Sequence, residues 1–67
     1  MSEYQPHQQR VIEERDQLHT RLLALENFLE TDRFLTLNRD EQAWLASQAG
    51  LMGAYLSILI KRIEAFA

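Results

Sequence analysis

The 67-residue sequence predicts an all-α fold, an antiparallel two-helix hairpin that assembles into a helical homo-oligomer. Apolar residues recur in each half of the chain at the alternating spacings of three and four that are typical of a coiled-coil stripe. The first stripe comprises Val11, Leu18, Leu22, Leu25 and Leu29, and the second comprises Leu45, Ala49, Met52, Leu56, Leu59, Ile63 and Phe66. Because no flexible linker divides the two stripes, we expect one domain over residues 1–67 in which they face each other.

The first helix is expected over about residues 6–30. Pro6 suits a first helical turn because its missing N–H would have no partner there. Good helix formers follow until Thr31 and Asp32 interrupt the rhythm. The first helix is therefore long, and its ending leaves room for a turn.

A turn segment over residues 31–38 should cover the closed end of the hairpin, with Phe28 and Phe34 packed together. Asn38 and Glu41 then have the spacing of a capping box, which predicts a second helix over about 39–65. Lys61 and Arg62 fall in its last turns, where cations complement the helix dipole.

Aligning the two stripes in antiparallel directions places Leu22 near Met52 and Val11 near Ile63. In this register Arg15 faces the neighbourhood of Leu59. A charged group on an apolar stripe is costly unless it is paired or reaches water. We therefore expect a carboxylate, a ligand or another subunit beside Arg15.

The composition limits the class of protein. A chain this short buries only about 60% of the surface of its unfolded form, and without cysteine it has no disulfides to compensate, so oligomerisation is favoured. The formal net charge of −3 argues against general nucleic-acid binding. The N-terminal residues do not resemble a secretory signal, so a cytoplasmic location is expected.

The second helix carries more apolar surface than one partner helix can cover. Small residues recur every four positions beside this surplus, which allows another helix to approach closely. The expected oligomer interface comprises Trp44, Ala46, Gly50, Leu51, Gly53, Ala54, Tyr55 and Ile58. The simpler alternative is that this second stripe covers the segment around Phe34.

A membrane span is a further alternative, because residues 43–60 carry no charge and Lys61 and Arg62 follow them. Gln48, the two glycines and the regular stripe argue against it. The first helix would also lose its partner in lipid.

Basic residues from both helices should converge at the open end of the hairpin. The candidate anion-binding residues are His7, Arg10, Arg15, Lys61 and Arg62. Guanidinium groups suit phosphate oxygens. Without other context, the simpler interpretation is that nearby carboxylates neutralise these side chains in surface ion pairs.

The sequence contains no catalytic or metal-binding pattern. His7 and His19 are too far apart for one helical face to offer both to a metal. No nucleophile–histidine–carboxylate arrangement or phosphate-binding glycine loop occurs. We therefore expect neither an enzyme nor a cofactor. Trp44 and Tyr55 are able to stack a nucleobase, although packing is their simpler role.

A set of short motifs runs along the chain: Pro6-His7-Gln8-Gln9-Arg10-Val11, Leu18, Leu25-x-x-Phe28, Phe34-x-x-Leu37, Glu41-Gln42, Leu45-x-x-Gln48, Met52-x-x-Tyr55 and Leu59-x-x-Arg62-Ile63. In these motifs the chain resembles a family of very small proteins of tailed phages and prophages, including crAss-like phages. The chain is also similar in size and hairpin plan to phage proteins that counter CBASS and Thoeris immunity by sequestering cyclic nucleotides.

These resemblances imply a phage accessory protein that binds a cyclic oligonucleotide between subunits. Arg10, Arg15, Lys61 and Arg62 would contact phosphates, and Tyr4 or Tyr55 would stack on bases. Two other functions account for the apolar surplus equally well. One is an inhibitor or adaptor that binds a bacterial host protein through the second helix, and the other is a purely structural oligomer.

Overall fold

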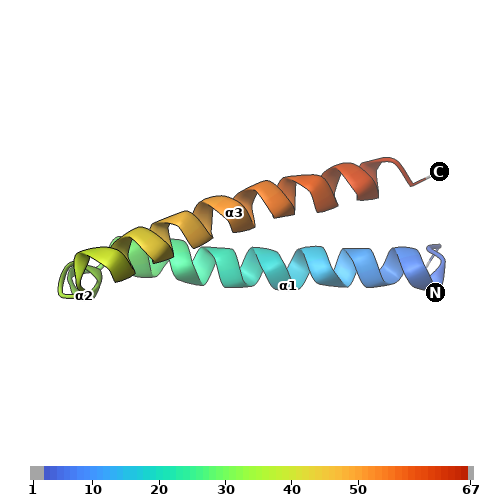
Figure 1. Ribbon diagram of the computed structural model, residues 1–67. Helices are drawn as coiled ribbons and strands as arrows, with labels where there is room; N and C mark the ends of the chain where they lie inside the picture. Colours follow the sequence, from blue (N-terminus) through green and yellow to red (C-terminus); the bar gives the residue numbers. More distant parts are fainter. Residues whose placement is uncertain (1–2, 67) are drawn as a thin grey trace.

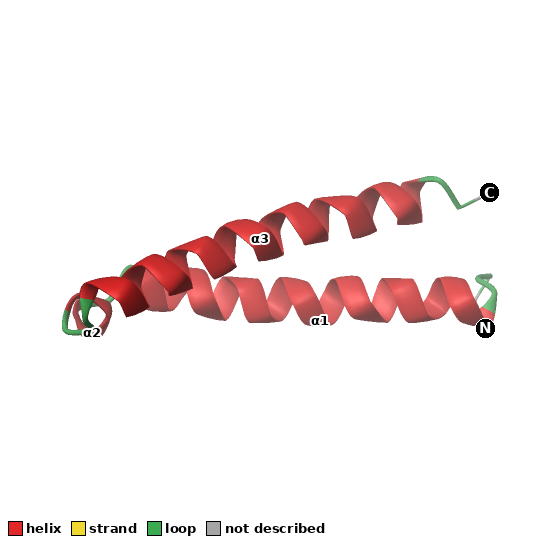
Figure 2. Cartoon of the chain, viewed as in Figure 1, coloured by secondary structure: helices red, strands yellow, loops and turns green. Residues whose placement is uncertain are grey.

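The computed structural model describes residues 3–66 and contains three helices in this range. They are α1 (Pro6–Leu29), α2 (Asp32–Leu35) and α3 (Arg39–Glu64). The two long helices, α1 and α3, run in opposite directions and pack against each other (Figure 1). Figure 2 shows that the described residues form helices and loops without any strand. The all-α class predicted from the sequence is confirmed.

Both long helices begin with local hydrogen bonds at their N-termini. Before Pro6, the backbone N–H of Gln5 donates to Oε1 of Gln8 at 2.9 Å. At the start of α3, the backbone N–H of Glu41 donates to Oδ1 of Asn38 at 2.9 Å. The side chain of Asn38 therefore caps α3 as its spacing from Glu41 predicts.

The segment between the long helices is more ordered than the expected turn. It contains α2, a single helical turn whose N-cap is Thr31, with Oγ1 accepting the backbone N–H of Phe34 at 3.3 Å. The Phe28 and Phe34 rings pack edge to face with their centroids 6.2 Å apart, as predicted. The Gln42 side chain also donates to the backbone oxygen of Leu37 at 2.9 Å. These contacts fix the closed end of the hairpin.

The core between α1 and α3 is narrow. Within residues 3–66 the buried hydrophobic side chains are Val11, Leu22 and Leu59, and Leu59 is fully buried at 0% exposure. A Cβ placed on Gly53 would lie 4.0 Å from Cδ2 of Leu22, one residue along α3 from the predicted neighbour Met52. The Tyr55 hydroxyl donates a hydrogen bond to the Glu14 carboxylate, which joins the two helices.

The hairpin leaves the outer side of α3 uncovered. Leu51 is 72% exposed and Trp44 is 67% exposed, and Ile58 is also exposed. By length and composition α3 could cross a bilayer, and only 6% of its most apolar window is buried. Several large apolar side chains of α3 therefore remain exposed after α1 has packed against it.

Candidate functional site

The open end of the hairpin holds both described ends of the chain. In Figure 1, the ribbons of α1 and α3 diverge towards this end. The rings of Tyr4 and Phe66 meet there edge to face, with centroids 6.0 Å apart and planes at 62°. Tyr4, a predicted base-stacking residue, is thus already packed against an aromatic partner of this chain.

Four of the predicted phosphate-binding residues lie exposed near the open end. His7 and Arg10 come from the first turns of α1, and Lys61 and Arg62 come from the last turn of α3. Within residues 3–66, none of these four side chains forms an ion pair. The surface neutralisation considered from the sequence is therefore not seen for them.

Arg15 does not belong to this group. Its Nε contacts Oδ1 of Asp16 at 2.8 Å, so the expected carboxylate is its own neighbour along α1. Arg15 lines a groove with His19, Leu56 and Ile60. Because Ile60 is about 160° around α3 from Arg62, this groove opens on a different side of α3 from the Arg62 side chain. The position of Arg15 around the helix axis does not determine its side-chain conformation, so the sequence did not predict this ion pair with the adjacent residue.

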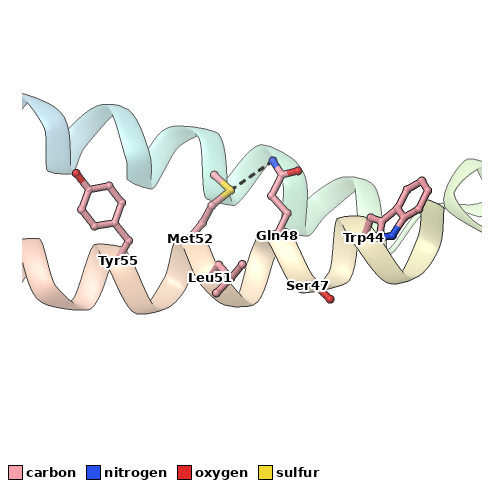
Figure 3. Close-up of a pocket in the computed structure, with 6 residues that line it drawn as sticks. All are labelled: Trp44, Ser47, Gln48, Leu51, Met52 and Tyr55. Carbon is pink, nitrogen blue, oxygen red and sulfur yellow. Dashed lines mark hydrogen bonds between the residues drawn. The ribbon is translucent and has the colours of Figure 1, made fainter. Parts of the chain in front are cut away.

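A second candidate site is a shallow groove on α3, which we call the outer groove (Figure 3). It is lined by Trp44, Ser47, Gln48, Leu51, Met52 and Tyr55. The Gln48 side chain donates to the Met52 sulfur at 3.8 Å, and both side chains extend from α3 towards α1. The lining carries no charge, and the carboxylate of Glu14 accepts the hydroxyl hydrogen of Tyr55 at its edge. The outer groove is therefore suited to apolar groups and lacks a cation for a phosphate.

The contact of Tyr55 with Glu14 was not predicted. Tyr55 appeared in the sequence as a stacking or interface residue, whereas in the structure its hydroxyl is held by α1. The antiparallel register places position 14 five residues, or about one and a half turns, from the residue facing Tyr55, so the long tyrosine side chain has to lean along α1 to reach it. Register is the one sequence signal that could have suggested the contact.

The predicted oligomer interface divides between two sides of α3. Trp44, Leu51 and Ile58 are exposed, as are the small residues Ala46, Gly50 and Ala54. Gly53 differs, because it is half-buried and lies against Leu22. It belongs to the packing between α1 and α3, a position that the four-residue spacing of small residues did not distinguish.

A substitution at Gly50 tests whether another helix packs against this position of α3. A Cβ at this position would meet nothing within 4 Å, so we expect Gly50→Ala to raise the free energy of unfolding by about 1 kcal/mol through helix propensity. Urea unfolding followed by circular dichroism measures this change. Destabilisation would contradict the open surroundings of Gly50 and would indicate that another helix approaches there.

Together these features define a small helical-hairpin protein with exposed cations among the side chains of its open end and exposed apolar residues on α3. The Sequestin family model matches residues 5–65, and the chain belongs to the Sequestin family. A relative from Enterobacteria phage T4, described as an "Uncharacterized 7.5 kDa protein in denB-rIIB intergenic region", is 47% identical over 60 residues. The match covers 90% of this chain and 94% of the relative. No solved structure matches the chain.

The phage relative confirms the broader part of the resemblance seen in the sequence. The chain is a member of a family of small phage proteins. The link to crAss-like phages and the binding of cyclic nucleotides stay predictions.

Proposed function

We propose that this protein is a phage counter-defence protein that sequesters a cyclic nucleotide immune signal in a homo-oligomer in the bacterial cytoplasm. The family name, Sequestin, points to sequestration. The observation that carries the ligand chemistry is the open end, where Arg10, Lys61 and Arg62 form no ion pair within residues 3–66. Such groups attract phosphate oxygens.

The cations approach the ligand from two helices. Arg10 belongs to the first turns of α1, and Lys61 and Arg62 belong to the last turn of α3. A phosphodiester between the helix ends would receive positive charge from both sides. The N-terminus of α1 adds a favourable dipole. His7 is a further donor on the same turn of α1 as Arg10.

Binding the bases requires more than one hairpin provides. Tyr4 packs on Phe66, and Tyr55 is hydrogen-bonded to Glu14. A base would have to displace one of these contacts or bind against a second subunit. The exposed apolar face of α3 supports the second possibility, because assembly would place further side chains around the ligand. Function is then stoichiometric binding without a reaction.

The outer groove favours a second candidate function, that of an inhibitor or adaptor of a bacterial host protein. Its uncharged lining between Trp44 and Tyr55 matches the apolar stripe of a partner helix, which docks through side chains spaced three and four residues apart. This function needs the apolar face of α3 but does not need the cations of the open end.

Native mass spectrometry of the purified protein tests the proposal. The protein is produced in one host that expresses a cyclic-nucleotide synthase and in one that lacks it. We expect an oligomer that carries an additional nucleotide mass only from the first host. An empty oligomer from both hosts would contradict sequestration of that synthase's products and favour the host-protein alternative.

A further inference from the structure

One stripe on the outer side of α3 has its charged residues at the two ends and its apolar residues between them. The stripe, which we call the outer stripe, comprises Asp40, Trp44, Leu51, Ile58 and Arg62. At 100° per residue these five positions fall within about 40° of one another around the helix. All five are exposed in the hairpin.

The spacing within the outer stripe is symmetric about Leu51. Trp44 and Ile58 lie seven residues before and after it, and Asp40 and Arg62 lie eleven residues before and after it. We propose that the outer stripe pairs with the same stripe of a second copy, in antiparallel orientation around a two-fold axis at Leu51. Trp44 then packs against Ile58 of the other copy, and Asp40 faces Arg62 of the other copy.

The chemistry of the stripe favours a second copy as its partner. Leu51, at its centre, is the most exposed large apolar side chain within residues 3–66. A two-fold interface makes every contact twice, so the pairing gives two Asp40–Arg62 ion pairs and two Trp44–Ile58 contacts. Neither Asp40 nor Arg62 has an ion-pair partner within residues 3–66.

The charges also determine the direction of pairing. A parallel arrangement would place Asp40 against Asp40 and Arg62 against Arg62, which repel each other. The antiparallel arrangement replaces both repulsions with attractions. It is also consistent with the dipoles, because each α3 begins beside the end of the other.

The pairing refines the proposed nucleotide site, and this consequence alone rests on the proposed function. The open ends of the two copies lie at opposite ends of the dimer, each beside the closed end of the other copy. Because Arg62 is paired with Asp40 of the other copy, Arg10 and Lys61 are the residues that contact the phosphates. The dimer therefore has two separate ligand sites.

Charge substitutions test the pairing without any nucleotide present. In a homodimer of the Asp40→Lys variant, the introduced lysine faces Arg62, and in a homodimer of the Arg62→Asp variant, the introduced aspartate faces Asp40. In the mixed dimer, both contacts are attractive. By sedimentation equilibrium we expect the mixed dimer to be roughly tenfold tighter than either homodimer. Equal affinities would overturn the proposal.

Leu51→Gln and Leu23→Gln form a matched pair for the apolar centre. Both residues are exposed leucines in the middle of long helices, but Leu23 lies on α1 outside the outer stripe. We expect Leu51→Gln to weaken the wild-type dimer roughly tenfold and Leu23→Gln to leave it unchanged. Equal effects would contradict the central position of Leu51. A monomeric wild-type protein in sedimentation equilibrium would also overturn the proposal. So would a flotation experiment in which the wild-type protein binds phosphatidylcholine–phosphatidylglycerol vesicles as a monomer.

Cysteine cross-linking tests the direction, because the natural chain contains no cysteine. We expect a Trp44→Cys copy to cross-link with an Ile58→Cys copy in preference to another Trp44→Cys copy. The opposite preference would contradict antiparallel pairing. Since these measurements use protein without nucleotide, failure of the pairing and failure of nucleotide sequestration are separate results.

Discussion

Replacing Leu59 with alanine is expected to remove most of the stability of the hairpin. Leu59 is the fully buried side chain at the centre of the packing between α1 and α3, and deleting a buried leucine costs about 2–5 kcal/mol. Small domains have little stability in excess of this amount. Urea unfolding followed by circular dichroism should show the midpoint falling towards zero denaturant.

Leu35→Ala provides the control for this prediction. Leu35 is 68% exposed on α2, so the same chemical change should alter the free energy of unfolding by no more than about 0.5 kcal/mol. Each unfolding curve is measured at several protein concentrations because assembly also stabilises the folded chain. Similar losses in the two variants would show that Leu59 is not the centre of the core.

The helix architecture was predictable because its signals are local. Pro6 begins α1 and the Asn38 side chain caps α3, and both effects operate within one helical turn. The register followed from the apolar stripes, since aligning them in antiparallel directions along their full length needs no insertion in either helix. The contact of Leu22 with the position of Gly53 agrees with that alignment to within one residue.

The candidate site was less predictable because it depends on which way side chains turn. Arg15 was expected at the open end, but a bond to Asp16 directs it elsewhere. Tyr55 was expected to be available for a base, yet it reaches across to Glu14. Hydrophobic periodicity gives the angle of a residue around its own helix and contains no information about rotamers or about the distance between helices.

The cations of the open end and the apolar face of α3 would bind partners of different chemistry. The open end offers exposed cations, whereas the lining of the outer groove offers apolar contacts without charge. One small polyanion cannot satisfy both surfaces of a single hairpin. A self-associating protein uses both, because the apolar face binds another copy while the cations remain at the ends of the assembly.

Reversing the charge of Arg10 is expected to abolish nucleotide retention while assembly persists. In the proposed complex the Arg10 guanidinium contacts a phosphate, and a glutamate there would both remove a charged hydrogen bond and repel the ligand. Losing a hydrogen bond to a charged group costs about 1.5–3 kcal/mol, and with repulsion we expect roughly 100-fold weaker binding. Equilibrium dialysis with the nucleotide identified by mass spectrometry measures this change.

Arg21→Glu is the matched control, because Arg21 lies on the same helix as Arg10 and is also exposed. Their separation of eleven positions is close to three helical turns, so both side chains project from the same side of α1. The two variants therefore have identical net charge and differ only in distance from the open end. If Arg21→Glu weakened binding as much as Arg10→Glu, the nucleotide would be responding to the overall charge of α1, and the open end would not be its site.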